Sequence, residues 1–315
     1  MALYIGLDYG WEWITYEVKD GRGRMVKRGG IESNPEALRE FLSEYKSERN
    51  VTVAFEAGAG LYWMEDVVRE LGMRSHPFHA TAYKVIVESK KKTDKVDAKK
   101  IAEGARKDIL PERVVVPEGK ERKLRQLLSE RETYHKELTR WACRLRAHAA
   151  NNGSVLHVRL LTRSERSWEE ALEALEGRAR EVAMRMYRSA LPLFQHLEEV
   201  EVEIKELLGD KELAGASRCL QTYPGIGPIT AAAILAWAGV NASRFVGGRE
   251  AASYFGLVGS TYKSGKLERG GHITKQGPAI PRRLLVQAAW AFLSSKEGME
   301  SEWGKWFCRV AKKLS

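Results

Sequence analysis

VTVAFEAG, residues 51–58, is a nearly continuous apolar run that ends in an acid, Glu56, and a glycine. Its length and its β-branched content predict a strand, and the lack of regular polar alternation indicates that both faces are buried. A strand buried on both faces belongs to a sheet that helices cover on its two sides. This stretch therefore predicts an α/β domain around it.

The segments around this strand alternate strand and helix patterns. Strand patterns occur in ALYIGLDYG (2–10), WITYEVKD (13–20), the stretch after the glycine-rich turn at 20–24, and RSHPFHA (74–80). Asn34 and Pro35 are typical of a helix start, and LYWMEDVVRELG (61–72) predicts a helix that Gly72 closes. We therefore expect the α/β sheet domain to span residues 1–112.

The amino-acid composition indicates the kind of partner that the protein binds and the kinds of site that it lacks. The chain has 315 residues, with 52 Lys and Arg against 42 Asp and Glu, a net charge of +10. That excess of positive charge favours a polyanionic partner, although a basic surface alone is weak evidence for one. The three cysteines lie far apart and form no CxxC pair, which excludes the usual zinc and disulfide patterns.

No segment predicts a membrane location. The longest apolar run, ITAAAILAWAGV (229–240), is too short to cross a bilayer, and the N-terminus lacks the basic start of a signal peptide. We expect a cytoplasmic, nucleoid-associated protein of a prokaryotic cell, with no membrane partner.

Two further regions follow the sheet domain. Residues 113–212 carry heptad-like series, one at 127–148 and one at 168–186, and these predict two long paired helices separated by AANNGS (149–154). Pro192 should kink or divide the second helix. The pair either stabilises one chain or forms a dimerisation arm. Residues 213–315 predict a mainly helical third domain with one loop rich in Gly, Lys and Arg, from Gly256 to Ala279.

Four acids form the main candidate site. Asp8 lies in the first strand, Glu56 ends the buried strand, and Asp94 and Asp97 share one face of a helix in the lysine-rich stretch KKKTDKVDAKK (90–100). Such acids supply the oxygen ligands that Mg²⁺ requires, and two ions can assist phosphoryl transfer. Each acid taken singly has a structural alternative, because Asp94 could cap its helix and Glu56 could face solvent.

LQTYPGIGPITAAAIL (220–235) predicts a helix–hairpin–helix. Gly225 and Gly227 would let the backbone approach a phosphate, and the helix that starts near Pro228 would point its N–H groups at it. Such contacts position a duplex without reading its sequence. The alternative is a plain tight turn between packed helices.

These motifs resemble a known family. The strand Asp, the strand Glu and KTDKVDAKKIA (92–102) resemble the N-terminal domain of the DEDD-type insertion-sequence transposases, relatives of the Piv DNA invertase. YFGLVGSTYKSGKLERGGHITKQGPAIPRRLLVQAA (254–289) resembles their C-terminal domain, although Gly259, Pro278 and Pro281 depart from the usual pattern.

The resemblance implies an RNase H-like, RuvC-type fold for residues 1–112, with Asp8, Glu56, Asp94 and Asp97 binding Mg²⁺ or a substituting Mn²⁺. It implies that Ser264 attacks DNA phosphorus to give a phosphoserine-type intermediate. From the residues alone Ser260 competes with it, and His272 is the local candidate for a base.

The resemblance also implies partners: donor and target double-stranded DNA, a structured guide RNA encoded beside the gene, and assembly as a homodimer or tetramer in which one chain's acids meet another chain's serine. The residues expected to contact nucleic acid are Lys90, Lys91, Lys92, Lys95, Gly225, Gly227, Lys263, Lys266, Arg269, Lys275, Arg282 and Arg283.

Two other functions fit the same residues. A resolvase-like nuclease would use the four acids with water as nucleophile and would leave Ser264 an ordinary loop residue. A non-catalytic nucleic-acid scaffold would keep the hairpin and a degenerate sheet domain, but the presence of all four acids counts against it.

Overall fold

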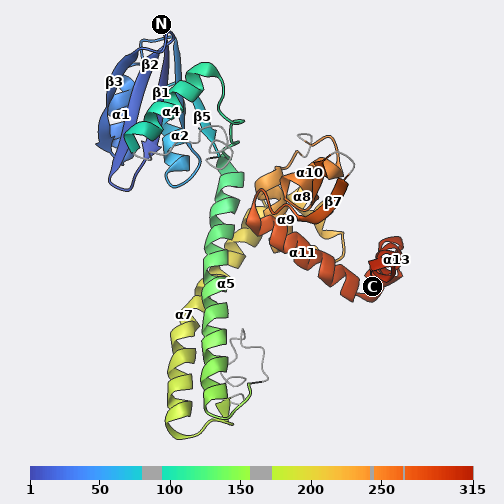
Figure 1. The fold of residues 1–315 in the computed structure, drawn as a ribbon. Helices are drawn as coiled ribbons and strands as arrows, with labels where there is room; N and C mark the ends of the chain where they lie inside the picture. Colours follow the sequence, from blue (N-terminus) through green and yellow to red (C-terminus); the bar gives the residue numbers. More distant parts are fainter. Residues whose placement is uncertain (80–93, 157–171, 242–244, 265–266, 315) are drawn as a thin grey trace. The chain divides into compact units, whose positions relative to one another are not determined.

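The computed structural model describes residues 1–79, 94–156, 172–241, 245–264 and 267–314 (Figure 1). The chain divides into two compact units, Met1–Val116 and Pro117–Ser315. The first unit is the predicted α/β domain. In the second, the long helices and the C-terminal segment share a hydrophobic core, so these two regions fold together.

The first unit is built on one five-stranded sheet with the order β3-β2-β1-β4-β5. Its strands are β1 (Ala2–Tyr9), β2 (Trp13–Asp20), β3 (Met25–Glu32), β4 (Asn50–Glu56) and β5 (Arg74–Phe78). The first three form an antiparallel meander, whereas β4 pairs in parallel with β1 and β5 pairs in parallel with β4. All five strands confirm the sequence prediction, and the mixed sheet is consistent with an RNase H-like domain.

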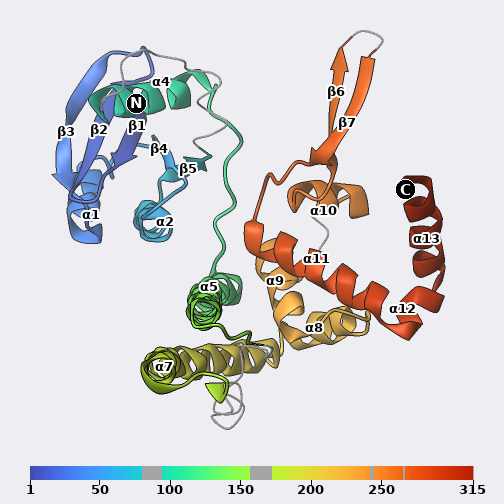
Figure 2. The ribbon, with the colours of Figure 1, turned by 60° about the horizontal axis from the view of Figure 1, so that its bottom comes forward.

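Helices cover both faces of this sheet, as the buried strand predicts. On one face, α1 (Pro35–Ser43) and α2 (Leu61–Glu70) pack on the odd-numbered side chains of β1, such as Ile5 and Leu7. On the other face lies α4 (Asp94–Lys107), and Figure 2 shows it across the sheet from α1 and α2. Asn34 caps α1 by accepting a hydrogen bond from the Ala37 amide, 2.8 Å away.

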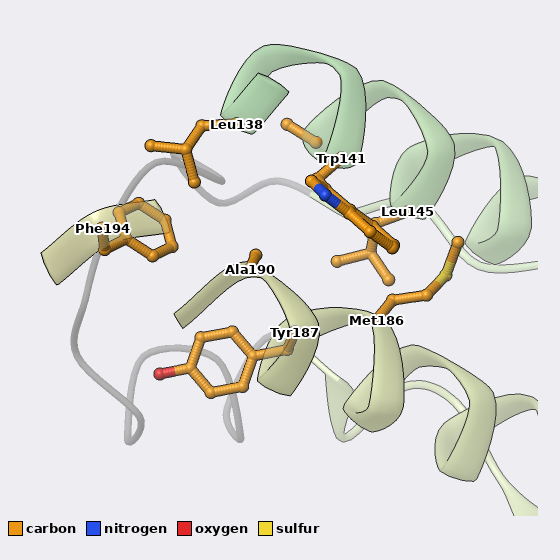
Figure 3. A pocket seen from close by; sticks show the side chains of 8 residues that line it. Leu138, Trp141, Leu145, Met186, Tyr187, Ala190 and Phe194 are labelled. Atoms are coloured by element: carbon orange, nitrogen blue, oxygen red, sulfur yellow. The ribbon is translucent and has the colours of Figure 1, made fainter. Parts of the chain in front are cut away.

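Two long helices begin the second unit. α5 (Gly119–Asn151) and α7 (Gly177–Leu208) pack along each other, and α5 ends at the predicted break. Part of the first heptad series is buried, including Leu127, Leu138 and Leu145. Figure 3 shows a pocket between the two helices, lined from α5 by Leu138, Trp141, Ala142 and Leu145 and from α7 by Met186, Tyr187, Ala190 and Phe194. Regular coiled-coil geometry stays a prediction.

The prediction that Pro192 could divide the second helix was wrong. α7 continues through Pro192, because packing of its neighbours Ala190 and Phe194 against Leu138 of α5 holds the helix on both sides of the proline. The start of the second heptad series, at Trp168, lies outside the described residues.

The remaining described elements of the second unit follow α7 along the chain. They are α8 (Ala214–Gln221), α9 (Pro228–Ala238), α10 (Gly248–Tyr254), β6 (Gly259–Ser264), β7 (Leu267–Ile273), α11 (Ala279–Ser294), α12 (Lys296–Glu300) and α13 (Glu302–Leu314). The antiparallel hairpin of β6 and β7 lies where the sequence predicted only a basic loop. Within the described part of the chain, no helix combines the length and the apolarity that a membrane crossing requires.

Candidate active site

Asp8 and Glu56 lie at the same edge of the sheet. β1 and β4 are parallel neighbours, and their last register pair is Leu7 with Phe55, so Asp8 and Glu56 follow one step later on both strands. Side chains that pair across parallel strands share a face, and successive residues alternate faces. Leu7 and Phe55 belong to the core beneath α1 and α2. The two acids therefore lie on the opposite face, which α4 covers.

The direction of α4 brings its two acids to this edge. A Cβ on Gly6 would overlap the backbone of Ala98 and Ala102, so the middle of α4 lies on the middle of β1. Farther along the helix, a Cβ on Gly23 would lie 3.1 Å from Arg106 Nε. Gly23 is at the opposite end of the sheet from Asp8. The N-terminal turn of α4, with Asp94 and Asp97, therefore points toward the edge that carries Asp8.

The chemistry of this edge suits a hard divalent cation. Asp8 and Asp97 are half-buried and Glu56 is exposed, and all three offer carboxylate oxygens, the donors that Mg²⁺ prefers. The Asp97 carboxylate lies 4.0 Å from Lys100 Nζ, at the outer limit of an ion pair. Among the side chains that the structure describes, no three His, Cys, Asp or Glu residues are close enough to hold one ion together. The side chain of Asp94 lies outside that set.

A charge cluster fixes α4 to the sheet behind this edge. Glu103 of α4 accepts hydrogen bonds from Arg106 and from Lys19 of β2, whose Nζ is 2.9 Å away. Arg106, then Lys19 and Lys107, hold the pKa of the Glu103 carboxyl far below its usual range, although partial burial acts in the opposite direction. The cluster sets the position of α4, and with it that of Asp94 and Asp97.

The lysines of the N-terminal motif fall largely outside the described structure. Lys90, Lys91 and Lys92 lie in residues 80–93, and Lys95 belongs to α4 without a described side chain. Their contact with nucleic acid stays a prediction.

The predicted helix–hairpin–helix has the expected order: α8, a turn, and α9 with Pro228 in its first turn. The two glycines of this turn have different surroundings. Gly225 has φ +88°, and a Cβ there would overlap the carbonyl of Ala288, so this glycine serves packing against α11. A Cβ on Gly227 would meet nothing within 4 Å. Gly227, which precedes the helix N-terminus, therefore has open space beside it, and its contact with a phosphate stays a prediction.

The candidate nucleophile lies near the tip of the β6–β7 hairpin. Ser264 is the last residue of β6 and pairs with Leu267, while its side chain and those of Lys263 and Arg269 lie outside the described set, as does all of Lys266. Ser260, the competing serine, lies lower on the hairpin and donates a hydrogen bond to the His272 carbonyl at 3.1 Å. That bond gives Ser260 a structural role.

Two arginines expected to contact nucleic acid have partners within the protein. Arg282 Nη1 lies 3.3 Å from the backbone carbonyls of Phe255, Gln276 and Gly277, and so fastens the base of the hairpin. Arg283 forms an ion pair with Glu132 of α5.

Lys275 adopts a left-handed conformation at the base of the hairpin, with φ +54°, and its amide donates to the Gly256 carbonyl at 3.1 Å. This backbone contact is independent of its charged end. Sequence reasoning also missed the start of β2 and the turn before it, where Trp13 and Trp11 are exposed beside the acid edge. Two tryptophans within three residues, WEW, are the signal that could have indicated them.

Two family models match the chain. A DEDD-type IS110 transposase model matches residues 5–151, the segment with the four acids, and a model described as the transposase IS116/IS110/IS902 family matches residues 217–303, the segment with the turn glycines and Ser264.

Three known proteins are similar in sequence. The chain is 25% identical to the putative transposase y4rJ of Sinorhizobium fredii, over 93% of this chain and 81% of that protein. It is 33% identical to the transposase for insertion sequence element IS1328 of Yersinia enterocolitica, over 36% of this chain and 33% of that protein. A probable family 20 transposase of Pseudomonas aeruginosa is 31% identical, over 36% of this chain and 37% of its own length.

Proposed function

This chain belongs to the DEDD-type insertion-sequence transposases of the IS110 family, and from that premise we propose that it cleaves and rejoins DNA strands with a carboxylate site and a serine nucleophile. As a member of that family it is a DNA transposase, an enzyme of phosphoryl transfer. The observation that supports the carboxylate site is that Asp8 and Glu56 end neighbouring parallel strands on the sheet face toward which the N-terminal turn of α4 points.

We assign Asp8, Glu56, Asp94 and Asp97 to the binding of divalent metal, with Mg²⁺ the natural ion and Mn²⁺ a substitute. When bound there, the metal would stabilise the charge on the reacting and leaving oxygens. The four carboxylates would hold and orient the ion. α4 positions two of them, because it covers the sheet directly behind the acids, with Ala98 packed on Gly6.

Ser264 is our proposed nucleophile. Its Oγ would attack a DNA phosphorus atom, so that a serine–phosphate ester forms as the bond to one deoxyribose oxygen breaks. The serine proton passes to solvent, and the released deoxyribose oxygen takes up a proton from solvent and leaves as a hydroxyl, so that no proton is gained or lost overall. A hydroxyl on another strand can reverse this exchange, which conserves the ester bond and requires no nucleotide cofactor. The hydrogen bond from Ser260 to His272 favours Ser264 over Ser260.

DNA would be held by the turn at Gly227 and by the cations of the basic hairpin, through contacts to phosphate. We extend the proposal to the partners that the family implies: donor and target duplexes, a guide RNA that pairs with both, and a dimer or tetramer of this chain in which one chain's acids serve another chain's serine. The net charge of +10 suits these polyanions.

The carboxylate site is tested with isosteric variants. We expect Asp8→Asn and Glu56→Gln to abolish Mg²⁺-dependent cleavage of a supercoiled plasmid that carries the element's ends, while salt-sensitive DNA binding persists. Glu40→Gln, an exposed acid on α1 at the other face of the sheet, is the matched control and should cleave normally. Cleavage by Asp8→Asn at the parental rate would refute the assignment.

The nucleophile is tested by trapping. Denaturing gels of the reaction should show protein covalently joined to DNA for the parent and for Ser260→Ala, and no such adduct for Ser264→Ala. If Ser264→Ala still cleaves and no adduct forms with any variant, the enzyme is a water-dependent nuclease. Sequencing of RNA that copurifies with the native protein tests the guide RNA separately.

A further inference from the structure

The sheet carries an aromatic surface directly beside the acid edge. Trp11 is 86% exposed and lies in the short connection between β1 and β2, and Trp13, the first residue of β2, is 57% exposed. Tryptophan is highly buried on average, so two such indoles exposed within three residues need a physical reason.

Trp13 shares a sheet face with Asp8. Asp8 pairs with Thr15 across the antiparallel β1–β2 ladder, and Trp13 lies two residues before Thr15, on the same face. Further along that face of β2, Lys19 reaches Glu103 of α4. Trp13 is therefore a diagonal cross-strand neighbour of Asp8, at a Cα separation of about 7–8 Å. It lies on the α4 face of the sheet, on the side of Asp8 away from β4.

The Trp13 backbone and ring are held in place. Its carbonyl accepts a hydrogen bond from the Gly10 amide at 3.0 Å, and the Ser33 amide donates to the Glu12 carbonyl at 2.9 Å, so β3 holds the turn. The indole lies against Gly30, where a Cβ would be 3.8 Å from Trp13 Cε3. The ring thus lies beside Gly30 while much of the indole stays exposed, and a base that stacks on it would bind a side chain whose backbone is already ordered, at little cost in ordering entropy.

We propose that Trp13, assisted by Trp11, is a stacking platform for an unpaired nucleotide next to the phosphate that the acid edge receives. This inference rests on the proposed function, and it specifies the substrate as a strand with at least one unstacked base. Stacking on an indole requires a free base face, which a continuous duplex does not offer.

The surroundings favour a base over a protein partner. Glu32 lies directly opposite Trp13 on β3, and Glu12 lies between the two tryptophans, both with exposed side chains. An apolar protein surface large enough to cover the indoles would also bury these carboxylates, which is costly. A single base covers only the ring, and the two acids keep backbone phosphates away from it, so that the base is the part that faces the platform.

The test compares two DNA probes by fluorescence anisotropy: a fully paired duplex, and the same duplex with a central unpaired bubble that carries 2-aminopurine. We expect Trp13→Ala to weaken binding to the bubble by about tenfold, because stacking on one base is worth that order of affinity. Duplex binding should stay unchanged, and Trp13→Phe should retain most of the bubble affinity and of the 2-aminopurine quenching. Trp290→Ala, which removes an indole of similar exposure (64%) from α11, is the matched control and should change neither.

A second variant separates stacking from folding. Trp13 packs on Gly30, whereas Trp11 is almost fully exposed, so Trp11→Ala should leave thermal unfolding unchanged and still lower bubble affinity several-fold. If Trp11→Ala and a folded Trp13→Ala both bind the bubble as the parent does, the platform is refuted.

Refutation of the stacking platform can be distinguished from refutation of the proposed function. Asp8→Asn should lose cleavage and keep the preference for the bubble. A parent that cleaves no DNA but whose bubble affinity depends on Trp13 would refute the proposed function and support the platform.

Discussion

Gly6 of β1 lies directly against Ala98 of α4, with no room for a side chain between strand and helix: a Cβ on Gly6 would overlap the Ala98 carbonyl and the Ala102 amide. The placement of Asp94 and Asp97 depends on this contact, since both belong to the same helix. We predict that Gly6→Ala pushes α4 away and lowers the free energy of unfolding of the α/β domain by about 1–3 kcal/mol. Urea unfolding followed by circular dichroism measures this loss.

The same variant should lose DNA cleavage at temperatures where it is still folded, because the acids on α4 move relative to Asp8. Gly58→Ala is the control for stability, since a Cβ there would meet nothing within 4 Å. We expect it to unfold as the parent does. Full cleavage activity in folded Gly6→Ala would show that the position of α4 does not matter to the site.

Sequence reasoning predicted this sheet well because its signals are local. The apolar run that ends at Glu56, the cap at Asn34 and the glycine-rich turn before β3 each act within a few residues, and each corresponds to an element of the structure. The register that places Asp8 beside Glu56 depends on pairing between distant strands. Parallel pairing of the two strands leaves no local signal, so the sequence alone could not show which residues of β1 and β4 lie side by side, and the convergence of all four acids stays a prediction.

The Glu103 cluster predicts a pH-dependent contribution to stability. The pKa of Glu103 is lower in the folded protein than in the unfolded chain, mainly because of Arg106 and then Lys19. A lowered pKa stabilises the fold above the carboxyl's ordinary pKa, and that stabilisation is lost as the pH falls through the folded-state value. At pH 7, Glu103→Gln should cost about 1–2 kcal/mol, a value limited by partial solvation of the pair.

Urea unfolding of Glu103→Gln and the parent at pH 7 and at a pH below the ordinary carboxyl range measures this linkage. The two proteins should differ at neutral pH and converge in acid. Glu44→Gln is the control, because its ion pair with Lys27 lies in solvent and should contribute no measurable stability. A difference that stays constant with pH would exclude the ion pairs as its cause.

The two glycines of the α8–α9 turn should respond oppositely to substitution. Gly225→Ala introduces a Cβ at φ +88° against the α11 backbone, so it should destabilise the second unit by about 2 kcal/mol or more. Gly227→Ala has room for its methyl group and should fold normally, but it should weaken duplex binding by crowding the phosphate. Thermal unfolding and DNA binding by fluorescence anisotropy, measured on both variants, test these two predictions. Normal DNA binding by Gly227→Ala would exclude the turn as a phosphate contact.

In the basic segment from Gly256 to Ala279, sequence reasoning did not predict the β-hairpin. Its glycines and cations predicted a loop, but Thr261 and Tyr262 on one strand pair with Gly270 and Arg269 on the other. Strand formation here depends on pairing, and six glycines in the segment lower its apparent strand propensity. Charge likewise predicted Arg282 as a phosphate contact, whereas three backbone carbonyls at the base of the hairpin surround its guanidinium.

Arg282 therefore gives the last prediction: its shape should matter more than its charge. Arg282→Lys keeps the charge, but an ammonium group cannot serve three carbonyls with the planar fork of a guanidinium. We expect Arg282→Ala and Arg282→Lys alike to speed hydrogen exchange at the Thr274 and Lys275 amides, which close the base of the hairpin by donating to Val258 and Gly256. Arg283→Lys, which can keep its ion pair with Glu132, is the control and should leave that exchange unchanged.

If Arg282 instead holds a phosphate, Arg282→Ala will reduce the salt dependence of DNA binding by about one counterion and Arg282→Lys will restore it. Because lysine can neutralise a phosphate but cannot replace the fork, the lysine variant decides between the two roles.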